Sequence, residues 1–138
     1  GQGMDKNDGR VIANFMNQAI NNEDITIYGD GNQTRSFCYI EDTIDAIIKI
    51  MNKKENVETP INIGNPVEVT IKEIANMIKN ITGSKSNIKF CEANKDDPPR
   101  RKPDINKAIN EIGWKPKIEL EYGLKKCLEY YIDQNKII

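Results

Sequence analysis

Apolar residues recur at helical spacing in five stretches of the chain, around residues 10–20, 42–51, 70–82, 105–112 and 124–131. In each stretch an apolar residue returns every three or four positions, which puts these side chains on one face of a helix. We therefore predict five helices. Gly83 and Gly113 follow the third and fourth stretches and are placed to end those helices.

Polar residues before three of these stretches are typical helix caps. Asn7 or Asp8 is available to cap the first helix, and Asp42 can cap the second. Thr70 and Glu73 have the residue types and spacing of a capping box. These residues predict where the three helices start.

Shorter stretches rich in β-branched and aromatic residues predict strands. Residues 25–28 and 36–40 have this composition, and the turn residues 29–32 (Gly-Asp-Gly-Asn) lie between them. This arrangement predicts a strand, a tight turn and a second strand. Residues 61–63 and 88–91 are candidates for two further short strands.

Short strands that alternate with helices predict a mixed fold, either α/β or α+β. The 138 residues are enough for one domain with its own core. Lys and Arg number 20 against 21 Asp and Glu, a net charge of -1, which argues against nucleic acid or an anionic membrane surface as the main partner. The apolar runs are too short for a membrane helix, and no signal-peptide pattern is found.

The chain contains no His and three widely separated cysteines, Cys38, Cys91 and Cys127. A structural zinc site and a His-based catalytic triad are therefore not expected. An odd number of dispersed thiols is typical of a reducing compartment, so we expect a cytoplasmic protein.

Three arginines stand in surroundings that suit an anionic ligand. Arg10 begins an amphipathic helix, where free backbone N–H groups favour an anion. Arg35 follows the glycine turn, and Tyr28 before that turn offers a flat face for a base. Arg101 lies in the charged loop 96–104. Planar guanidinium groups bind diphosphate or carboxylate with two hydrogen bonds.

Each of these residues taken alone also fits a plainer interpretation. A loop arginine is usually a solvated surface charge. Tyr28 would be an ordinary half-buried strand residue, and Gly29 and Gly31 would simply form a hairpin turn. The residue types by themselves leave the choice open.

The chain resembles UDP-glucuronate decarboxylases (UDP-xylose synthases), which belong to the extended short-chain dehydrogenase/reductases. Five blocks carry the resemblance in this order: residues 4–11 (Met-Asp-Lys-Asn-Asp-Gly-Arg-Val), 27–42, 62–66 (Asn-Ile-Gly-Asn-Pro), 96–105, and 113–116 (Gly-Trp-Lys-Pro). The second and fifth blocks also resemble epimerases and dTDP-glucose 4,6-dehydratases. The first and fourth resemble the decarboxylases more narrowly.

The resemblance implies that residues 1–138 are the C-terminal, nucleotide-sugar-binding part of an enzyme that converts UDP-glucuronate to UDP-xylose and CO2 with NAD. In this family an N-terminal Rossmann domain holds NAD and the catalytic Tyr-x-x-x-Lys pair. That domain is expected to be absent from this chain. The helix from Asp42 and the strand at 61–63 would normally complete it. A nucleotide-sugar epimerase or dehydratase is the alternative enzyme, and a non-catalytic binding or scaffold module is the alternative outside enzymes.

The resemblance also implies which residues bind the nucleotide sugar: Arg10, Val11, Ile27, Tyr28, Gly29, Gln33, Arg35 and Arg101. Arg10 and Arg101 would position the sugar carboxylate and the diphosphate. Residues 27–29 would border the uracil, with Gln33 and Arg35 near the ribose and phosphate. No catalytic, cofactor-binding or metal-binding residue is expected in this chain.

Two features depart from what a complete family member needs. The chain has no Gly-x-x-Gly-x-x-Gly loop for a dinucleotide. Tyr122 and Lys126 match Tyr-x-x-x-Lys, but they fall in the last predicted helix, where the family has a non-catalytic segment, so we interpret the match as chance. Without the cofactor domain, strand edges and a helix face would be uncovered. We therefore expect a homo-oligomer such as a dimer, in which copies cover these surfaces by self-association or by swapping elements.

Overall fold

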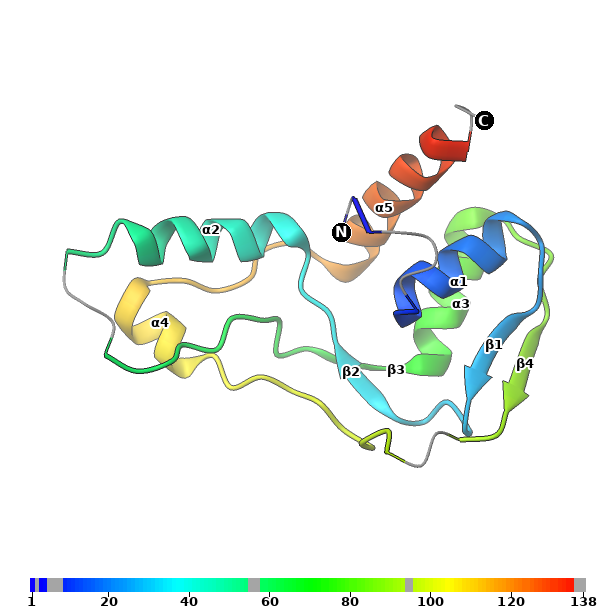
Figure 1. The fold of residues 1–138 in the computed structure, drawn as a ribbon, viewed down its shortest axis with the longest axis horizontal. Helices are drawn as coiled ribbons and strands as arrows, with labels where there is room; N and C mark the ends of the chain where they lie inside the picture. Colours follow the sequence, from blue (N-terminus) through cyan, green and yellow to red (C-terminus); the bar gives the residue numbers. More distant parts are fainter. Residues whose placement is uncertain (2, 5–8, 55–57, 94–95, 136–138) are drawn as a thin grey trace.

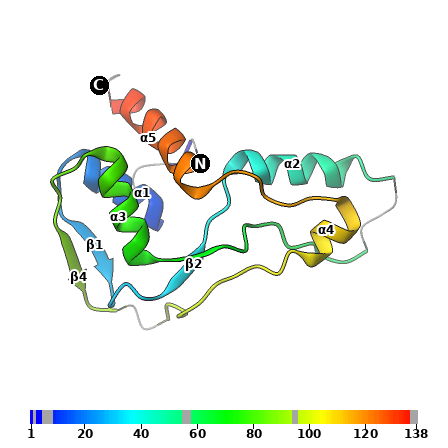
Figure 2. The ribbon, with the colours of Figure 1, turned by 180° about the vertical axis from the view of Figure 1, so that it is seen from behind.

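The structure is a computed structural model that describes residues 1, 3–4, 9–54, 58–93 and 96–135. These residues form five helices and four strands: α1 (Val11–Ile20), β1 (Ile25–Tyr28), β2 (Thr34–Ser36), α2 (Ile40–Met51), β3 (Glu68–Thr70), α3 (Ile71–Thr82), β4 (Ile88–Cys91), α4 (Asn106–Ile112) and α5 (Leu120–Asn135). The mixed α/β class predicted from the sequence is confirmed. Figures 1 and 2 show α1, α3, β1 and β4 at one end of the molecule, and α2 with α4 at the other.

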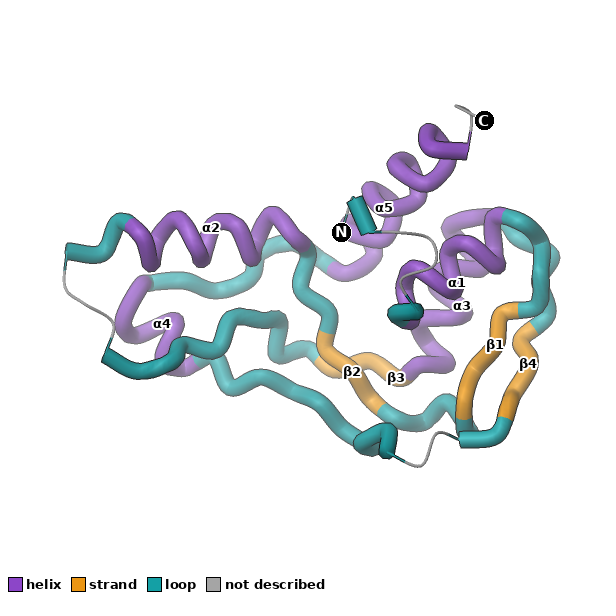
Figure 3. The backbone as a smooth tube through the Cα atoms, in the orientation of Figure 1, coloured by secondary structure: helices purple, strands orange, loops and turns teal. Residues whose placement is uncertain are grey.

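The four strands form two separate pairs. β1 and β4 run parallel, with Ile25 opposite Ile88 and Tyr28 opposite Cys91. β2 and β3 run antiparallel, with Thr34 opposite Thr70. Helices α1 and α3 both contact β1. The second pair lies between the two ends of the molecule (Figure 3) and joins them.

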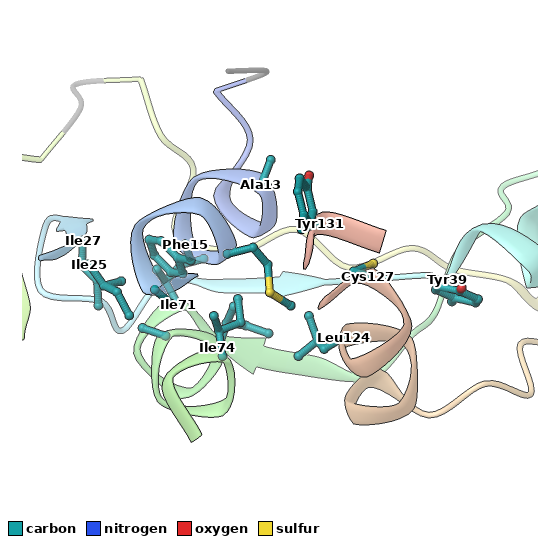
Figure 4. Packing of buried hydrophobic residues seen from close by; sticks show 14 residues of the cluster. Ala13, Phe15, Ile25, Ile27, Tyr39, Ile71, Ile74, Leu124, Cys127 and Tyr131 are labelled. Atoms are coloured by element: carbon teal, nitrogen blue, oxygen red, sulfur yellow. The ribbon is translucent and has the colours of Figure 1, made fainter. Parts of the chain in front are cut away.

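The main hydrophobic core lies between α1, β1, α3 and α5. Figure 4 shows side chains from these elements facing one another. The fully or nearly fully buried members include Ala13, Phe15, Met16, Ile25, Ile27, Ile74, Ile78, Leu124 and Cys127. The apolar faces predicted for the first, third and last helices are thus the faces that pack together.

Helix α3 begins and ends as its sequence predicts. The backbone N–H of Glu73 donates to Oγ1 of Thr70 at 3.1 Å, and the backbone N–H of Thr70 donates to the Glu73 carboxylate at 2.7 Å. Gly83 ends the helix at a φ of 65°, a left-handed conformation that favours glycine. The capping box lowers the pKa of Glu73, chiefly through the hydrogen bond from the Thr70 backbone.

A second, smaller core holds α2 against α4 and the segment that follows it. Trp114 is 1% exposed, and its indole N–H donates to the backbone carbonyl of Asp42 at 3.0 Å. The buried carboxylate of Asp42 accepts the backbone N–H groups of Lys117 and Ile118 at 3.0 and 2.9 Å. One aspartate therefore ties the start of α2 to a segment more than seventy residues away.

Two sequence predictions about helix starts need correction. Helix α2 begins at Ile40 with Tyr39 as its N-cap residue. Asp42 lies inside the first turn. Its carboxylate does not cap the helix but accepts the N–H groups of Lys117 and Ile118. Arg10 occupies the N-cap position of α1, and Asn7 and Asp8 lie outside the described residues.

The predicted hairpin is wrong, because β1 pairs with β4 and β2 pairs with β3. The N–H of Gly29 donates to the carbonyl of Cys91 at 3.0 Å, so the edge of β1 is taken by a distant strand. Residues 61–63 do not form a strand in the described chain. Ile61 and Ile63 pack against the second core instead, and residues 37–39 lead directly into α2.

One face of α2 is apolar and exposed. Ile44, Ile47 and Ile48 are 46%, 49% and 51% exposed, and Met51 at the end of the helix is 78% exposed. Their spacing is the helical one that predicted α2, and Figure 1 shows α2 lying apart from the main core. Within the described residues, the apolar face of this helix is left without a neighbour to cover it.

Candidate functional site

A cleft of about 550 Å³ lies where α1, β1, β2 and the loop after β4 meet. We call it the arginine cleft, after the three arginines that line it. Its lining residues are Gly9, Arg10, Val11, Asn14, Phe15, Thr26, Tyr28, Gln33, Arg35, Ser36, Phe37, Ile71, Asp97 and Arg101. Among these lining residues Asp97 is the one acid against three arginines, so the formal charge of the cleft is positive.

Arg10 brings the N-terminus of α1 to the cleft. It holds the N-cap position with an extended backbone conformation, φ -77° and ψ 147°. Its carbonyl already accepts the N–H of Asn14 at 3.0 Å, while the N–H groups of the first turn have no partner within a helix. The positive end of the helix dipole and a basic residue, Arg10, therefore lie at the same edge of the cleft, beside Val11.

The turn between β1 and β2 forms another wall of the cleft. Gly29 and Gly31 have φ values of 80° and 77°, which an L side chain rarely adopts. The side-chain amide of Gln33 donates to the carbonyl of Tyr28 at 2.7 Å and closes the turn. Tyr28 is 49% exposed, so its ring is available to a ligand while its backbone is held in β1.

Asp30, the acidic residue of this turn, stabilises the turn by hydrogen bonds. The Asp30 carboxylate accepts the backbone N–H of Asn32 at 2.9 Å and its side-chain amide at 2.8 Å. The backbone hydrogen bond from Asn32 lowers the pKa of Asp30. Asp30 therefore stays ionised and keeps the glycine turn in shape.

Arg35 is the most enclosed of the three cleft arginines, since Arg10 and Arg101 are exposed. Its side chain is 14% exposed. One terminal nitrogen donates to the carbonyl of Thr34 at 2.6 Å, and the other donates to the carboxylate of Asp97. The guanidinium group is thus fixed at both ends, and one of its anion-binding positions is filled by an acid of the chain itself.

A second groove of about 400 Å³ adjoins the arginine cleft. It is lined by Tyr28, Gly29, Asp30, Asn32, Gln33, Ala93, Asp97 and Pro99. Tyr28, Gln33 and Asp97 line both spaces. The two spaces therefore adjoin, with the arginines lining one and the glycine turn lining the other.

Six of the eight residues named from the sequence line the arginine cleft: Arg10, Val11, Tyr28, Gln33, Arg35 and Arg101. Gly29 lines the adjoining groove. Ile27 differs from the others, since its side chain is fully buried in the main core. Any contact from Ile27 to a ligand would have to come from its backbone. The roles of all eight in binding stay predictions.

The structure adds cleft residues that the sequence interpretation did not name as ligand contacts. Asp97 is the most informative, because it is charged and contacts Arg35. The others are Gly9, Asn14, Phe15, Thr26, Ser36, Phe37 and Ile71. Asn14 and Phe15 share a helix with Arg10, so helical spacing was a usable signal for them. Asp97 lies 62 positions from Arg35, and no local pattern connects the two.

The Tyr-x-x-x-Lys match in α5 lies elsewhere. Tyr122 and Lys126 are not among the residues that line either space. The ammonium group of Lys126 lies over the Tyr122 ring, 5.9 Å from its centroid, and donates to Glu129 at 2.9 Å. This geometry directs Lys126 toward the ring face and a carboxylate, and not toward a phenol beside a substrate.

The described residues do not form a dinucleotide phosphate site. The parallel strand β1 is followed by a turn that leads to β2, and β4 is followed by an irregular loop. A strand, a glycine loop and a helix N-terminus in direct succession, as in Rossmann domains, do not occur in this part of the chain. The described residues also contain no cluster of three or more His, Cys, Asp or Glu suited to a metal ion. None of the described helices is long and apolar enough to cross a membrane.

The fold and the cleft define a class of protein. The mixed α/β architecture matches the extended short-chain dehydrogenase/reductase fold of UDP-sugar epimerases. Residues 3–127 match the sequence model of the GDP-mannose 4,6 dehydratase family, and the chain belongs to that family.

Two curated relatives place the chain within this class more narrowly. UDP-glucuronic acid decarboxylase 1 of Danio rerio is 46% identical over 131 residues, 95% of this chain and 31% of the relative. UDP-glucuronic acid decarboxylase 3 of Arabidopsis thaliana is 46% identical over 124 residues, 90% of this chain and 36% of the relative. The resemblance to UDP-glucuronate decarboxylases drawn from five sequence blocks is thereby confirmed. The chain spans about a third of the length of these relatives.

Solved structures agree on the fold. UDP-glucose 4-epimerase of Thermotoga maritima, crystallised with UDP-glucose, has a TM-score of 0.92 and 29% identity, covering 98% of this chain and 43% of that one. UDP-glucuronic acid 4-epimerase of Bacillus cereus, in complex with UDP-glucuronic acid and NAD, has a TM-score of 0.86 and 28% identity, covering 91% of this chain and 40% of that one.

Proposed function

We propose that this chain is the UDP-sugar-binding part of an NAD-dependent UDP-glucuronate decarboxylase, which converts UDP-glucuronate to UDP-xylose and CO2. The observation that carries the proposal is that Arg10, Arg35 and Arg101, which lie far apart in the sequence, line one cleft. The identity of 46% to two UDP-glucuronic acid decarboxylases supports the choice of reaction.

The chemistry of the cleft suits this ligand. UDP-glucuronate carries a diphosphate and a sugar carboxylate, and guanidinium groups bind both kinds of oxyanion with paired hydrogen bonds. In the proposed complex Arg10 and Arg101 hold the carboxylate and diphosphate, and Arg35 with Gln33 lies near the ribose and phosphate. Tyr28 offers its exposed ring to the uracil, beside the backbone of Ile27 and Gly29.

The cofactor is assigned to another part of the enzyme. The described residues do not fit the pyrophosphate of NAD, because they lack a glycine loop between a parallel strand and a helix. We therefore propose that residues 1–138 bind and orient the nucleotide sugar, while hydride transfer and the Tyr-x-x-x-Lys pair belong to an N-terminal Rossmann domain that precedes them in the whole protein. This chain alone is expected to be inactive with added NAD.

We further propose that the isolated chain self-associates. Ile44, Ile47 and Met51 are exposed on one face of α2. Apolar surface of this kind favours association in water. A second copy can cover this face by packing the same helix against it, since a twofold contact uses one surface twice. The cytoplasmic location expected from the unpaired cysteines stays a prediction.

An epimerase of nucleotide sugars is the second candidate function. The observation in its favour is that the Thermotoga maritima and Bacillus cereus proteins, both 4-epimerases, share the fold with TM-scores of 0.92 and 0.86. The two reactions differ in whether the sugar carboxylate is lost. Incubating the whole protein with UDP-glucuronate and NAD, and measuring CO2 release together with the sugar product, separates them. CO2 with UDP-xylose supports decarboxylation, whereas UDP-galacturonate without CO2 supports epimerisation.

Calorimetric titration of this chain tests the binding role directly. The proposal predicts heat on addition of UDP and of UDP-glucuronate, and a ligand-dependent rise of the melting temperature. Absence of heat up to about millimolar ligand, with unchanged melting, would remove the binding role. That outcome would favour a scaffold module that shares the fold without the ligand.

A further inference from the structure

Two basic residues that flank Arg101 are held by one carboxylate. Nε and Nη2 of Arg100 donate to the two oxygens of Glu68 at 2.7 and 2.6 Å. Nζ of Lys102 lies 3.8 Å from the same carboxylate. Of three consecutive basic residues, the first and third therefore point to Glu68.

The backbone of this segment fixes the direction of the residue between them. Arg100 forms a parallel β-bridge with Thr34. The N–H of Thr34 donates to the carbonyl of Pro99 at 2.9 Å, and the N–H of Arg101 donates to the carbonyl of Thr34 at 3.3 Å. In extended chain, successive side chains point to opposite sides. With its neighbours on Glu68, Arg101 is directed to the other side, and it lines the arginine cleft.

Glu68 is itself held firmly. It lies in β3 opposite Ser36, its side chain is 19% exposed, and Oγ1 of Thr34 donates to its carboxylate at 2.9 Å. The hydrogen bond from Arg100 is the main cause that lowers the pKa of Glu68 to about 2. The carboxylate is therefore ionised throughout the neutral range and available to hold two cations.

A similar pair of neighbours occurs in β2. Thr34 directs its hydroxyl to Glu68, and the next residue, Arg35, lines the cleft. Glu68 thus accepts from Thr34 in β2 and from Arg100 in the loop, while the residue that follows each of them lines the cleft. Glu68 does not line the cleft or the adjoining groove, so it has no direct path to a ligand.

We propose that Glu68 is a positioning residue that sets the direction of Arg101 in the arginine cleft by holding Arg100 and Lys102. The inference rests on the proposed function, because it requires Arg101 to bind the anionic ligand. Glu68 contributes to affinity only through Arg101. When Glu68 no longer holds Arg100 and Lys102, the loop can rotate. Arg101 then no longer has a fixed direction toward the ligand.

A double-mutant cycle tests the inference. Affinity for UDP-glucuronate is measured by calorimetry in the wild-type chain, Glu68→Gln, Arg101→Ala and the double variant. We expect each single variant to bind about three- to tenfold more weakly, and the double variant to bind no more weakly than Arg101→Ala alone. Effects that multiply in the double variant, or an unchanged affinity of Glu68→Gln, would overturn the positioning role.

The cycle separates this inference from the proposed function. If Arg101→Ala alone leaves the affinity for UDP-glucuronate unchanged, the ligand role of Arg101 fails and the positioning role fails with it. If Arg101→Ala weakens binding while Glu68→Gln does not, only the positioning role fails.

A second pair of variants guards against a loss of folding. The Arg100 side chain is 65% exposed, so Arg100→Gln breaks the paired hydrogen bonds with little change to the core. It is expected to weaken binding as Glu68→Gln does, and again to have no effect when Arg101 is already alanine. If Arg100→Gln binds UDP-glucuronate with the same affinity as the wild-type chain, the proposal is contradicted. Lys85→Gln, on the turn after α3 and away from the cleft, is the matched control for loss of one positive charge.

Discussion

The carboxylate of Asp97 lies on the guanidinium group of Arg35, inside the cleft that we propose for an anionic ligand. Asp97 therefore occupies the kind of position that a phosphate oxygen would take. Its side chain is 38% exposed, against 14% for Arg35, so the acid is the more accessible partner and the one able to withdraw. A ligand anion at Arg35 has to compete with it.

We expect Asp97→Asn to bind UDP more tightly than the wild-type chain. Removal of the one negative charge that competes for Arg35 is worth roughly 1 kcal/mol at this exposure, or about fivefold in affinity. Calorimetry at low and high salt measures the change, which should shrink as salt is added. Asp96→Asn removes the same charge from the neighbouring exposed residue and should have a smaller effect. Weaker binding by Asp97→Asn would mean that Asp97 supports the ligand.

Trp114 is expected to be the most sensitive residue of the second core. Its replacement by Phe removes the indole hydrogen bond to the buried carbonyl of Asp42 and part of the buried volume. We expect a loss of about 1–3 kcal/mol in the free energy of unfolding, and about 3–5 kcal/mol for Trp114→Ala. Urea unfolding followed by circular dichroism measures both. Tyr122→Phe, at a residue that is 53% exposed, is the control and should change little.

The stability of the chain should depend on Glu68 in acid. The folded chain lowers the pKa of Glu68 from 4.5 to about 2, chiefly through the hydrogen bond from Arg100. The unfolded chain therefore takes up this proton first as the pH falls, and protonation favours unfolding. The contribution of Glu68 is fully present above pH 4.5 and is lost as the pH falls toward 2.

The measurement is the urea midpoint across this pH range for the wild-type chain and Glu68→Gln. The wild-type midpoint should fall more steeply between pH 4.5 and 2 than that of the variant. Glu23→Gln, at an exposed carboxylate near the end of α1, controls for the general loss of negative charge. Parallel curves for the wild-type chain and Glu68→Gln would contradict the ion-pair account.

The exposed face of α2 should govern association of the isolated chain. Replacing both Ile44 and Ile47 by Lys puts two positive charges into the apolar face, and should lower the fraction of dimer at a given concentration by about tenfold or more. Size-exclusion chromatography with light scattering measures the mass. Lys49→Gln on the same helix is the control. A wild-type chain that stays monomeric at high concentration would refute the association.

Local sequence signals were sufficient for most helices and insufficient for the sheets. The period of apolar residues and the Thr70–Glu73 box define α3, because both signals lie within one helix. The pairing of β1 with β4 puts Ile25 opposite Ile88. The residues near Ile25 in the sequence give no signal for such a distant partner. β3 has three residues, too few for a pattern, and it forms only because β2 is beside it. The hairpin prediction failed for the same reason, since the turn residues permit a hairpin without requiring it.

The cleft was predictable only in part. The surroundings of Arg10, Arg35 and Arg101 suggested an anionic ligand, but each residue alone also fitted a solvated surface charge. The resemblance to known enzymes was needed to favour the binding role. The contacts of Asp97 with Arg35 and of Glu68 with Arg100 span 62 and 32 positions. Such pairs are set by how the loop after β4 returns along β2, which depends on the whole fold.

The central claim is that three arginines from separate segments act on one anionic nucleotide sugar. Its most direct test is calorimetric titration of UDP-glucuronate into the wild-type chain and into the triple variant Arg10→Gln, Arg35→Gln and Arg101→Gln, with melting temperatures measured on both. We predict saturable binding by the wild-type chain and a loss of affinity of at least about tenfold in a folded triple variant. Equal affinity of the two folded proteins for UDP-glucuronate would contradict the account.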